Sequence, residues 1–139
     1  MPLTKEWLHR IQRWESALWQ ACYRPVGQLD LRGATTFDHL NPEQAAGLRY
    51  KLMPVGTRWG AKWEYGWFTT SFTLPPEAAG QRIVLNANPA AHATHPGECL
   101  VWVNGEIAGS FGWARSHLTL STAGIAGTEY HILIEAYTG

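Results

Sequence analysis

Beyond Pro54 the chain consists of short segments in which apolar and polar residues alternate, and turn-forming residues separate these segments. In residues 67–74, for example, Phe68, Phe72 and Leu74 share one parity, and most of their polar neighbours have the other. Because successive side chains of a strand point to opposite sides of a sheet, this segment is expected to bury one face of an antiparallel sheet. Several short strands of this kind predict a sandwich or a barrel.

The clearest local signal is the pair Asn104-Gly105, which lies between the strand-like residues 100–103 and 106–109. Both residues tolerate a positive φ, so the pair predicts a tight hairpin. A turn is expected at Gly33. Further strands are expected at residues 28–31, at 82–88 as a central strand, at 117–120 and at 130–137.

The N-terminal segment predicts one long amphipathic helix over residues 7–22. Thr4 is suited to cap its start, and Pro25 with Gly27 ends it. Farther on, Asn41 is expected to cap a single helical turn at residues 42–46. The large apolar residues that define the long helix recur at Trp7, Ile11, Trp14, Leu18 and Cys22.

These elements together predict a mostly β fold, an antiparallel two-sheet sandwich with an N-terminal α-helix. At 139 residues the chain has about the length of one domain. Residues 1–27 are expected to form a helical segment that packs on the sandwich, and residues 28–139 to form the sandwich itself.

Composition restricts the classes of function. Lysine plus arginine and aspartate plus glutamate number 11 each, so no net field attracts nucleic acid or an anionic membrane. Cys22 and Cys99 match no metal or redox spacing, which favours two reduced thiols. No apolar run is long enough to span a bilayer, and charges interrupt the N-terminal segment where a secretory signal would be apolar. We therefore expect a soluble, cytoplasmic protein.

Four segments and one histidine carry a family resemblance. The segments are WEYGWFTTSFTLP, AGQRIVLNANP, GECLVWVNGEIAGSF and YHILIEAYTG, with His117 between the last two. They resemble the N-terminal β-sandwich of bacterial α-mannosidases of glycoside hydrolase family 38, and the resemblance covers most of the chain after Gly56. It implies a galactose-binding-like jelly roll in front of a catalytic domain that holds a zinc ion and an aspartate nucleophile. The chain ends directly after an apolar strand, as expected of a domain fragment.

What the resemblance implies is a non-catalytic domain whose partner is the catalytic domain of the parent enzyme, and which shapes the entrance for the glycan. No cofactor is expected in this chain, since the zinc ion belongs to the catalytic domain. The rival interpretations are an autonomous carbohydrate-binding module, the similar sugar-binding domain of family 2 β-glycosidases, and a plain interaction domain. Glu98 and Glu106 suggest an acid pair, but scattered glutamates are more simply solvating, so no catalytic residue is expected.

The candidate contact residues Trp59, Trp63, Tyr65 and Trp67 share one parity, so an extended backbone would place all four on one face. There they would stack on the apolar face of a pyranose ring. Burial of large aromatic residues favours the other interpretation, in which they fill the space between the sheets or the seam to another domain.

Trp113 and His117 are further candidates for sugar or interdomain contact, although a histidine at a strand edge more often bonds to a loop carbonyl. His92 and His95, near Glu98 and Cys99, suggest a metal site. They are weak candidates, because an extended segment lacks the fixed ligand geometry that helical spacing supplies.

Overall fold

A computed structural model of the chain describes residues 4–93, 97–112 and 115–139, apart from the side chains of residues 19, 91 and 92. The elements in chain order are α1 (Lys5–Cys22), β1 (Arg32–Thr36), α2 (Pro42–Ala45), β2 (Lys51–Leu52), β3 (Glu64–Thr73), η1 (Pro76–Ala78), β4 (Ile83–Leu85), η2 (Pro89–His92), β5 (Glu98–Val103), β6 (Glu106–Phe111), β7 (Leu118–Ser121) and β8 (Glu129–Thr138).

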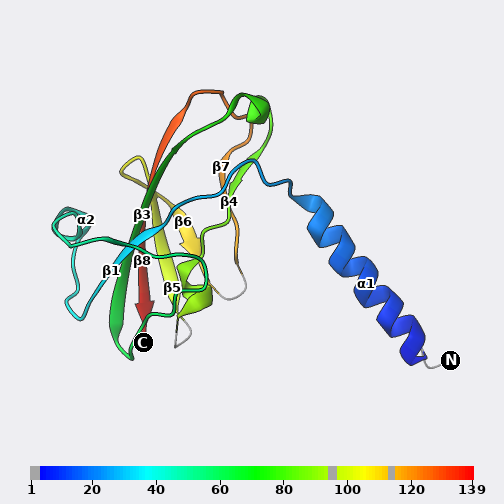
Figure 1. The fold of residues 1–139 in the computed structure, drawn as a ribbon, viewed down its shortest axis with the longest axis horizontal. Coiled ribbons are helices and arrows are strands. Elements are labelled where there is room, and N and C mark those ends of the chain that lie inside the picture. Colours follow the sequence, from blue (N-terminus) through cyan, green and yellow to red (C-terminus); the bar gives the residue numbers. More distant parts are fainter. Residues whose placement is uncertain (1–3, 94–96, 113–114) are drawn as a thin grey trace.

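The strands form two antiparallel sheets (Figure 1). The large sheet has the strand order β2-β1-β3-β8-β5-β6, and β4 pairs with β7 in a small second sheet. At the centre of the large sheet β3 and β8 pair along their whole length, from Glu64 opposite Thr138 to Thr73 opposite Glu129. The mostly β, antiparallel, two-sheet fold with an N-terminal helix is therefore confirmed.

Each face of the large sheet has its own apolar core. The larger core lies between this sheet and β4–β7, and it includes Phe68 of β3, Ile134 of β8 and Leu85 of β4. The smaller core lies on the opposite face, where Trp67 and Trp102 pack with Ala45 of α2. The alternation predicted for β3 is confirmed, because Phe68 and Phe72 contact the larger core while Ser71 and Thr73 are exposed.

The short-range predictions have mixed outcomes. The hairpin is confirmed, with Asn104 at φ 52 and Gly105 at φ 87 between β5 and β6. Asn41 caps α2 as predicted, and it forms a reciprocal capping box with Gln44. The turn at Gly33 is wrong, because this glycine lies within β1, where a Cβ atom would collide with Met53 and Phe68. Close approach, and not a turn, requires glycine there.

Two strand predictions are also wrong. Residues 28–31 form no strand, since the first strand begins at Arg32. The segment 82–88 yields only the three-residue β4, which pairs with β7 alone and is not central. Its apolar run ends at Leu85 and Pro89 follows, so few residues remain to extend a ladder.

The predicted helix is present as α1, and Thr4 occupies its N-cap without a side-chain hydrogen bond. Its expected packing on the sandwich is not observed, because α1 projects away from both sheets (Figure 1) and its described large apolar side chains are exposed. The chain leaves α1 in an extended conformation at Tyr23, and β4–β7 and α2 already cover the two faces of the large sheet. Among the described residues no helix is long and apolar enough to cross a membrane.

Candidate functional site

The structure separates the four aromatic residues that the sequence placed on one face. Trp59 lies in the larger core, 4.9 Å from the ring of Phe68, and its Nε1 donates to the carbonyl of Pro89 at 2.9 Å. Trp67 lies in the smaller core on the opposite face, stacked on Trp102. The expectation of a single face is wrong, because Gly60 and Trp63 adopt positive φ values of 88 and 68 and interrupt the extended backbone.

Trp63 and Tyr65 instead join a partly exposed aromatic row at one end of the large sheet. We define this aromatic row as Trp63, Tyr137, Tyr65 and His39. Its ring centroids are 6.3 Å apart for Trp63 and Tyr137, 4.6 Å for Tyr137 and Tyr65, and 5.3 Å for Tyr65 and His39. Tyr65 and Tyr137 lie directly opposite each other on β3 and β8. The pairing of the two central strands therefore creates the row.

Trp63 forms one end of the aromatic row and is largely accessible. It is 55% exposed, and the ammonium group of Lys62 lies 5.0 Å from its ring centroid. Its backbone N–H donates to the carbonyl of Thr138 at 2.7 Å. The hydroxyl of the buried Thr138 lies within hydrogen-bond distance of the carbonyls of Ala61 and Glu64. Hydrogen bonds to Thr138 at the end of β8 therefore stabilise the positive φ of Trp63, through Trp63 itself and through the neighbouring residues Ala61 and Glu64.

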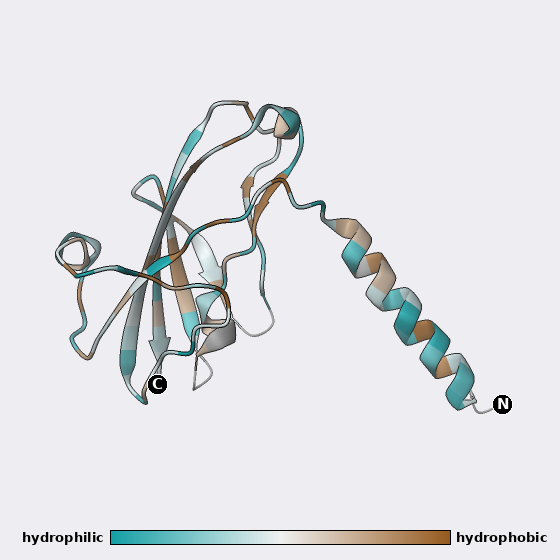
Figure 2. Ribbon diagram, in the orientation of Figure 1, coloured by the Kyte–Doolittle hydropathy of each residue, from teal (hydrophilic) through white to brown (hydrophobic). Residues whose placement is uncertain are grey.

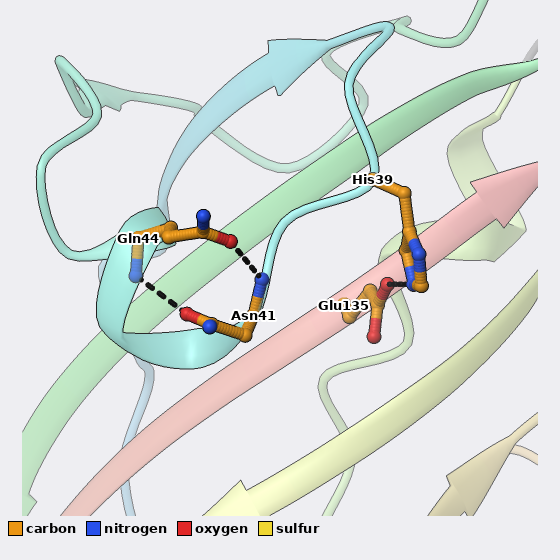
Figure 3. A network of polar contacts seen from close by, with 4 residues as sticks. All are labelled: His39, Asn41, Gln44 and Glu135. Atoms are coloured by element: carbon orange, nitrogen blue, oxygen red, sulfur yellow. Dashed lines mark hydrogen bonds and ion pairs between the residues drawn. The ribbon is translucent and has the colours of Figure 1, made fainter.

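A carboxylate and an imidazole meet beside Tyr65. Oε1 of Glu135 lies 3.8 Å from Nε2 of His39, and the Glu135 side chain is only 16% exposed (Figure 3). Burial raises the pKa of Glu135, and the electrostatic interaction with His39 partly offsets that rise. The capping box of α2 follows His39 in the chain: Asn41 Oδ1 accepts from the Gln44 amide at 2.8 Å, and Gln44 Oε1 accepts from the Asn41 amide at 2.9 Å. This cap orders the loop that carries His39.

The row has a second acidic neighbour. Glu98 of β5 lies directly opposite Tyr137 of β8, and opposed residues of paired strands share a face. Flat rings next to carboxylates suit a sugar, whose C–H face stacks on the rings while its hydroxyls donate to the acids. They equally suit the polar, aromatic surface of another protein domain.

The sequence identified only part of this surface. Trp63 and Tyr65 were predicted as contact residues, whereas Tyr137, His39 and Glu135 were not. Tyr137 carried a usable signal, because it shares the outward parity of Leu133 in the last strand. His39 carried none, since its contact with Glu135 joins residues that are far apart in the chain.

The remaining candidates lie elsewhere or are not described. His117 stacks on Tyr23 with ring centroids 4.4 Å apart, and its Nδ1 lies 2.8 Å from the Ser116 hydroxyl instead of a loop carbonyl. Trp113, His95 and the side chain of His92 fall outside the described residues. Within the described part of the chain, no group of three or more His, Cys, Asp or Glu residues is arranged to hold a metal ion.

The two cysteines differ in environment. Both are free thiols, with Cys22 exposed and Cys99 buried. Burial raises the pKa of Cys99 to about 12, and a backbone hydrogen bond opposes this rise. Cys99 is therefore a protonated core residue at neutral pH.

Comparison with known proteins identifies the fold family. A family model described as the jelly roll domain of α-mannosidase matches residues 27–138. Neither the curated proteins nor the solved structures gave a match. The matched segment includes both sheets and every residue of the aromatic row, and it leaves out α1. This chain therefore belongs to the family of α-mannosidase jelly-roll domains.

Proposed function

We propose that this chain is the non-catalytic jelly-roll domain of a family 38 α-mannosidase, where it supports the catalytic domain and shapes the entrance for the glycan. The observation that carries this proposal is the family match over residues 27–138. The aromatic row, whose ends Trp63 and His39 are exposed, supplies a contact surface for such a role. The two free thiols support a cytoplasmic location for the enzyme.

The catalytic chemistry then belongs to the partner domain, together with its zinc ion. The carboxylates beside the aromatic row support a binding role, since Glu135 is engaged with His39 and Glu98 lies opposite an aromatic residue. On this proposal the isolated chain has no hydrolytic activity. The test incubates the purified chain with a chromogenic aryl α-mannoside. Release of the chromophore at a rate proportional to the concentration of the chain would refute the assignment.

The aromatic row is suited to face the catalytic domain. Trp63 and Tyr137 lie next to Thr138, where β8 ends. In a parent chain whose catalytic domain follows β8, that domain begins beside the row. Covering the exposed ring of Trp63 would then contribute at most about 3 kcal/mol to the association of the two domains.

The direct test uses the parent enzyme, obtained by extending the gene beyond codon 139. Trp63→Ala should lower kcat/KM for an oligomannoside, or the thermal stability of the assembled enzyme. Phe37→Ala provides the matched control, because Phe37 is also an exposed aromatic residue but lies outside the row. If both variants had the same kcat/KM and thermal stability as the wild type, the row would contribute neither to the interface nor to the glycan entrance.

The second candidate function is an autonomous carbohydrate-binding module. It is favoured by the accessible rings of the row beside Glu98 and Glu135. Calorimetric titration of the isolated chain with mannosides distinguishes the two functions. Binding that Trp63→Ala abolishes without loss of stability would establish the module, and absence of binding would favour the supporting domain. The α-mannosidase match weighs against an origin in a family 2 β-glycosidase.

A further inference from the structure

The helix α1 presents an apolar stripe that no described part of the sandwich covers. The large apolar side chains of α1 that the structure describes are between 45% and 76% exposed, and Figure 2 shows apolar residues along a helix that stands clear of both sheets. Soluble proteins rarely leave a continuous apolar surface of this kind without a partner. The stripe consists of Trp7, Leu8, Ile11, Trp14 and Leu18.

The spacing of the stripe indicates the form of its partner. The intervals from Trp7 to Ile11, Trp14 and Leu18 are four, three and four residues, which is the a/d repeat of a two-stranded coiled coil. Trp7 and Trp14 occupy d positions, and Ile11 and Leu18 occupy a positions. Leu8 lies at position e and flanks this seam, so the a and d residues are suited to pack against one partner helix while Leu8 borders the contact.

The charged residues beside the a and d positions favour a second copy of α1 as the partner and a parallel orientation of the two helices. In the same heptad register Arg10 occupies position g and Glu15 position e. The guanidinium of Arg10 lies 5.1 Å from the ring centroid of Trp7, so it flanks the seam. In a parallel pair of identical helices, position g faces the e position five residues farther along the other helix. Arg10 of each copy would therefore face Glu15 of the other.

We propose that α1 is a dimerisation helix, which pairs in parallel with α1 of a second copy of this chain. The antiparallel arrangement is less favourable, because it places g against g and e against e, where Arg10 gains no opposite charge. The helix projects away from its own sandwich (Figure 1). This leaves room for two sandwiches at the same end of the pair. A seam of fewer than three heptads predicts a weak, reversible dimer.

The first test measures the oligomeric state of the chain by sedimentation equilibrium over a concentration series. The wild type should pass from monomer to dimer, and Trp14→Glu should remain monomeric. His9→Glu is the matched control, because position 9 lies on the opposite side of the helix, at f, and this variant should dimerise like the wild type. A wild type that is monomeric up to its solubility limit would overturn the proposal, as would equal dimerisation of Trp14→Glu.

The second test examines the direction of pairing. Arg10→Glu or Glu15→Arg alone should weaken the dimer about three- to tenfold, since each loses two surface ion pairs and gains repulsion. The double reversal should restore it. A short bismaleimide should link the two Cys22 thiols, which lie side by side only in the parallel pair; in the antiparallel pair they are separated by roughly 28 Å along the axis. The parallel arrangement would be refuted if each single charge reversal left the dimerisation constant unchanged and the bismaleimide failed to link the two Cys22 thiols.

Other occupants of the stripe would give different results. A membrane surface predicts a monomer that sediments with vesicles of anionic phospholipid and is released by Trp14→Glu. An interdomain contact predicts that Trp14→Glu destabilises the parent enzyme while the isolated chain remains monomeric. Either result would overturn the proposal. The outcome is independent of the proposed mannosidase role, because the family match excludes α1.

Discussion

Gly66 is the position at which a single added methyl group should damage the fold most clearly. A Cβ atom there would lie 2.5 Å from Cζ3 of Trp59 and 2.6 Å from Cε2 of Phe68. Trp59 cannot move aside without cost, because it is buried and its Nε1 donates to the Pro89 carbonyl at 2.9 Å. Overpacking of this kind costs about 1–3 kcal/mol, and loss of the indole hydrogen bond adds about 1 kcal/mol.

We therefore expect Gly66→Ala to lower the free energy of unfolding by about 2–4 kcal/mol. Urea unfolding followed by tryptophan fluorescence and by near-ultraviolet circular dichroism measures this change. Gly27→Ala is the control, because a Cβ atom at Gly27 meets no atom within 4 Å, and its effect should stay within about 0.5 kcal/mol.

A double-mutant cycle with Trp59→Leu identifies the cause. If the clash with the indole dominates, Gly66→Ala should cost less in the Trp59→Leu background than in the wild type. The reasoning is refuted if Gly66→Ala matches Gly27→Ala in stability. It is equally refuted if the cost of Gly66→Ala is the same in both backgrounds.

Three further predictions concern single groups. Burial raises the pKa of Glu135, so the folded state holds its proton to higher pH than the unfolded state, and stability falls as the pH rises through that window. Glu135→Gln should therefore be more stable than the wild type at neutral pH and equal to it below pH about 4; a constant difference across this range would contradict the assignment. Ellman's reagent should modify Cys22 rapidly and Cys99 only after unfolding, because burial raises the pKa of Cys99 to about 12, and two rapidly reacting thiols would disprove its burial. Gly105→Ala should cost about 1 kcal/mol in thermal or urea unfolding, since this residue adopts φ 87 in the hairpin; an unchanged midpoint would indicate a different turn.

The sequence was most informative where one segment contains all of the relevant information. The helical period of α1, the Asn104-Gly105 turn and the Asn41 cap each depend on residues a few positions apart. The buried face of β3 was likewise readable from the alternation in residues 67–74, as Phe68 illustrates. Motifs of the same segments indicated the jelly-roll family that the comparison confirmed.

The sequence was least informative where contacts join distant segments. It placed Trp59 with Trp67, because parity assumes an unbroken strand, and the positive φ values of Gly60 and Trp63 break that assumption. It read Gly33 as a turn, although this glycine makes room for Met53 and Phe68 from other parts of the chain.

The sequence by itself determined which residues of each strand are apolar, where the hairpin turns and that α1 is amphipathic, because these properties follow from local periodicity. Only the tertiary structure decided that Tyr65, Tyr137 and His39 form one row beside Glu135, and that α1 stands away from the sandwich. The physical reason is that the register of β3 on β8 and the coverage of both sheet faces are set by packing across the whole chain.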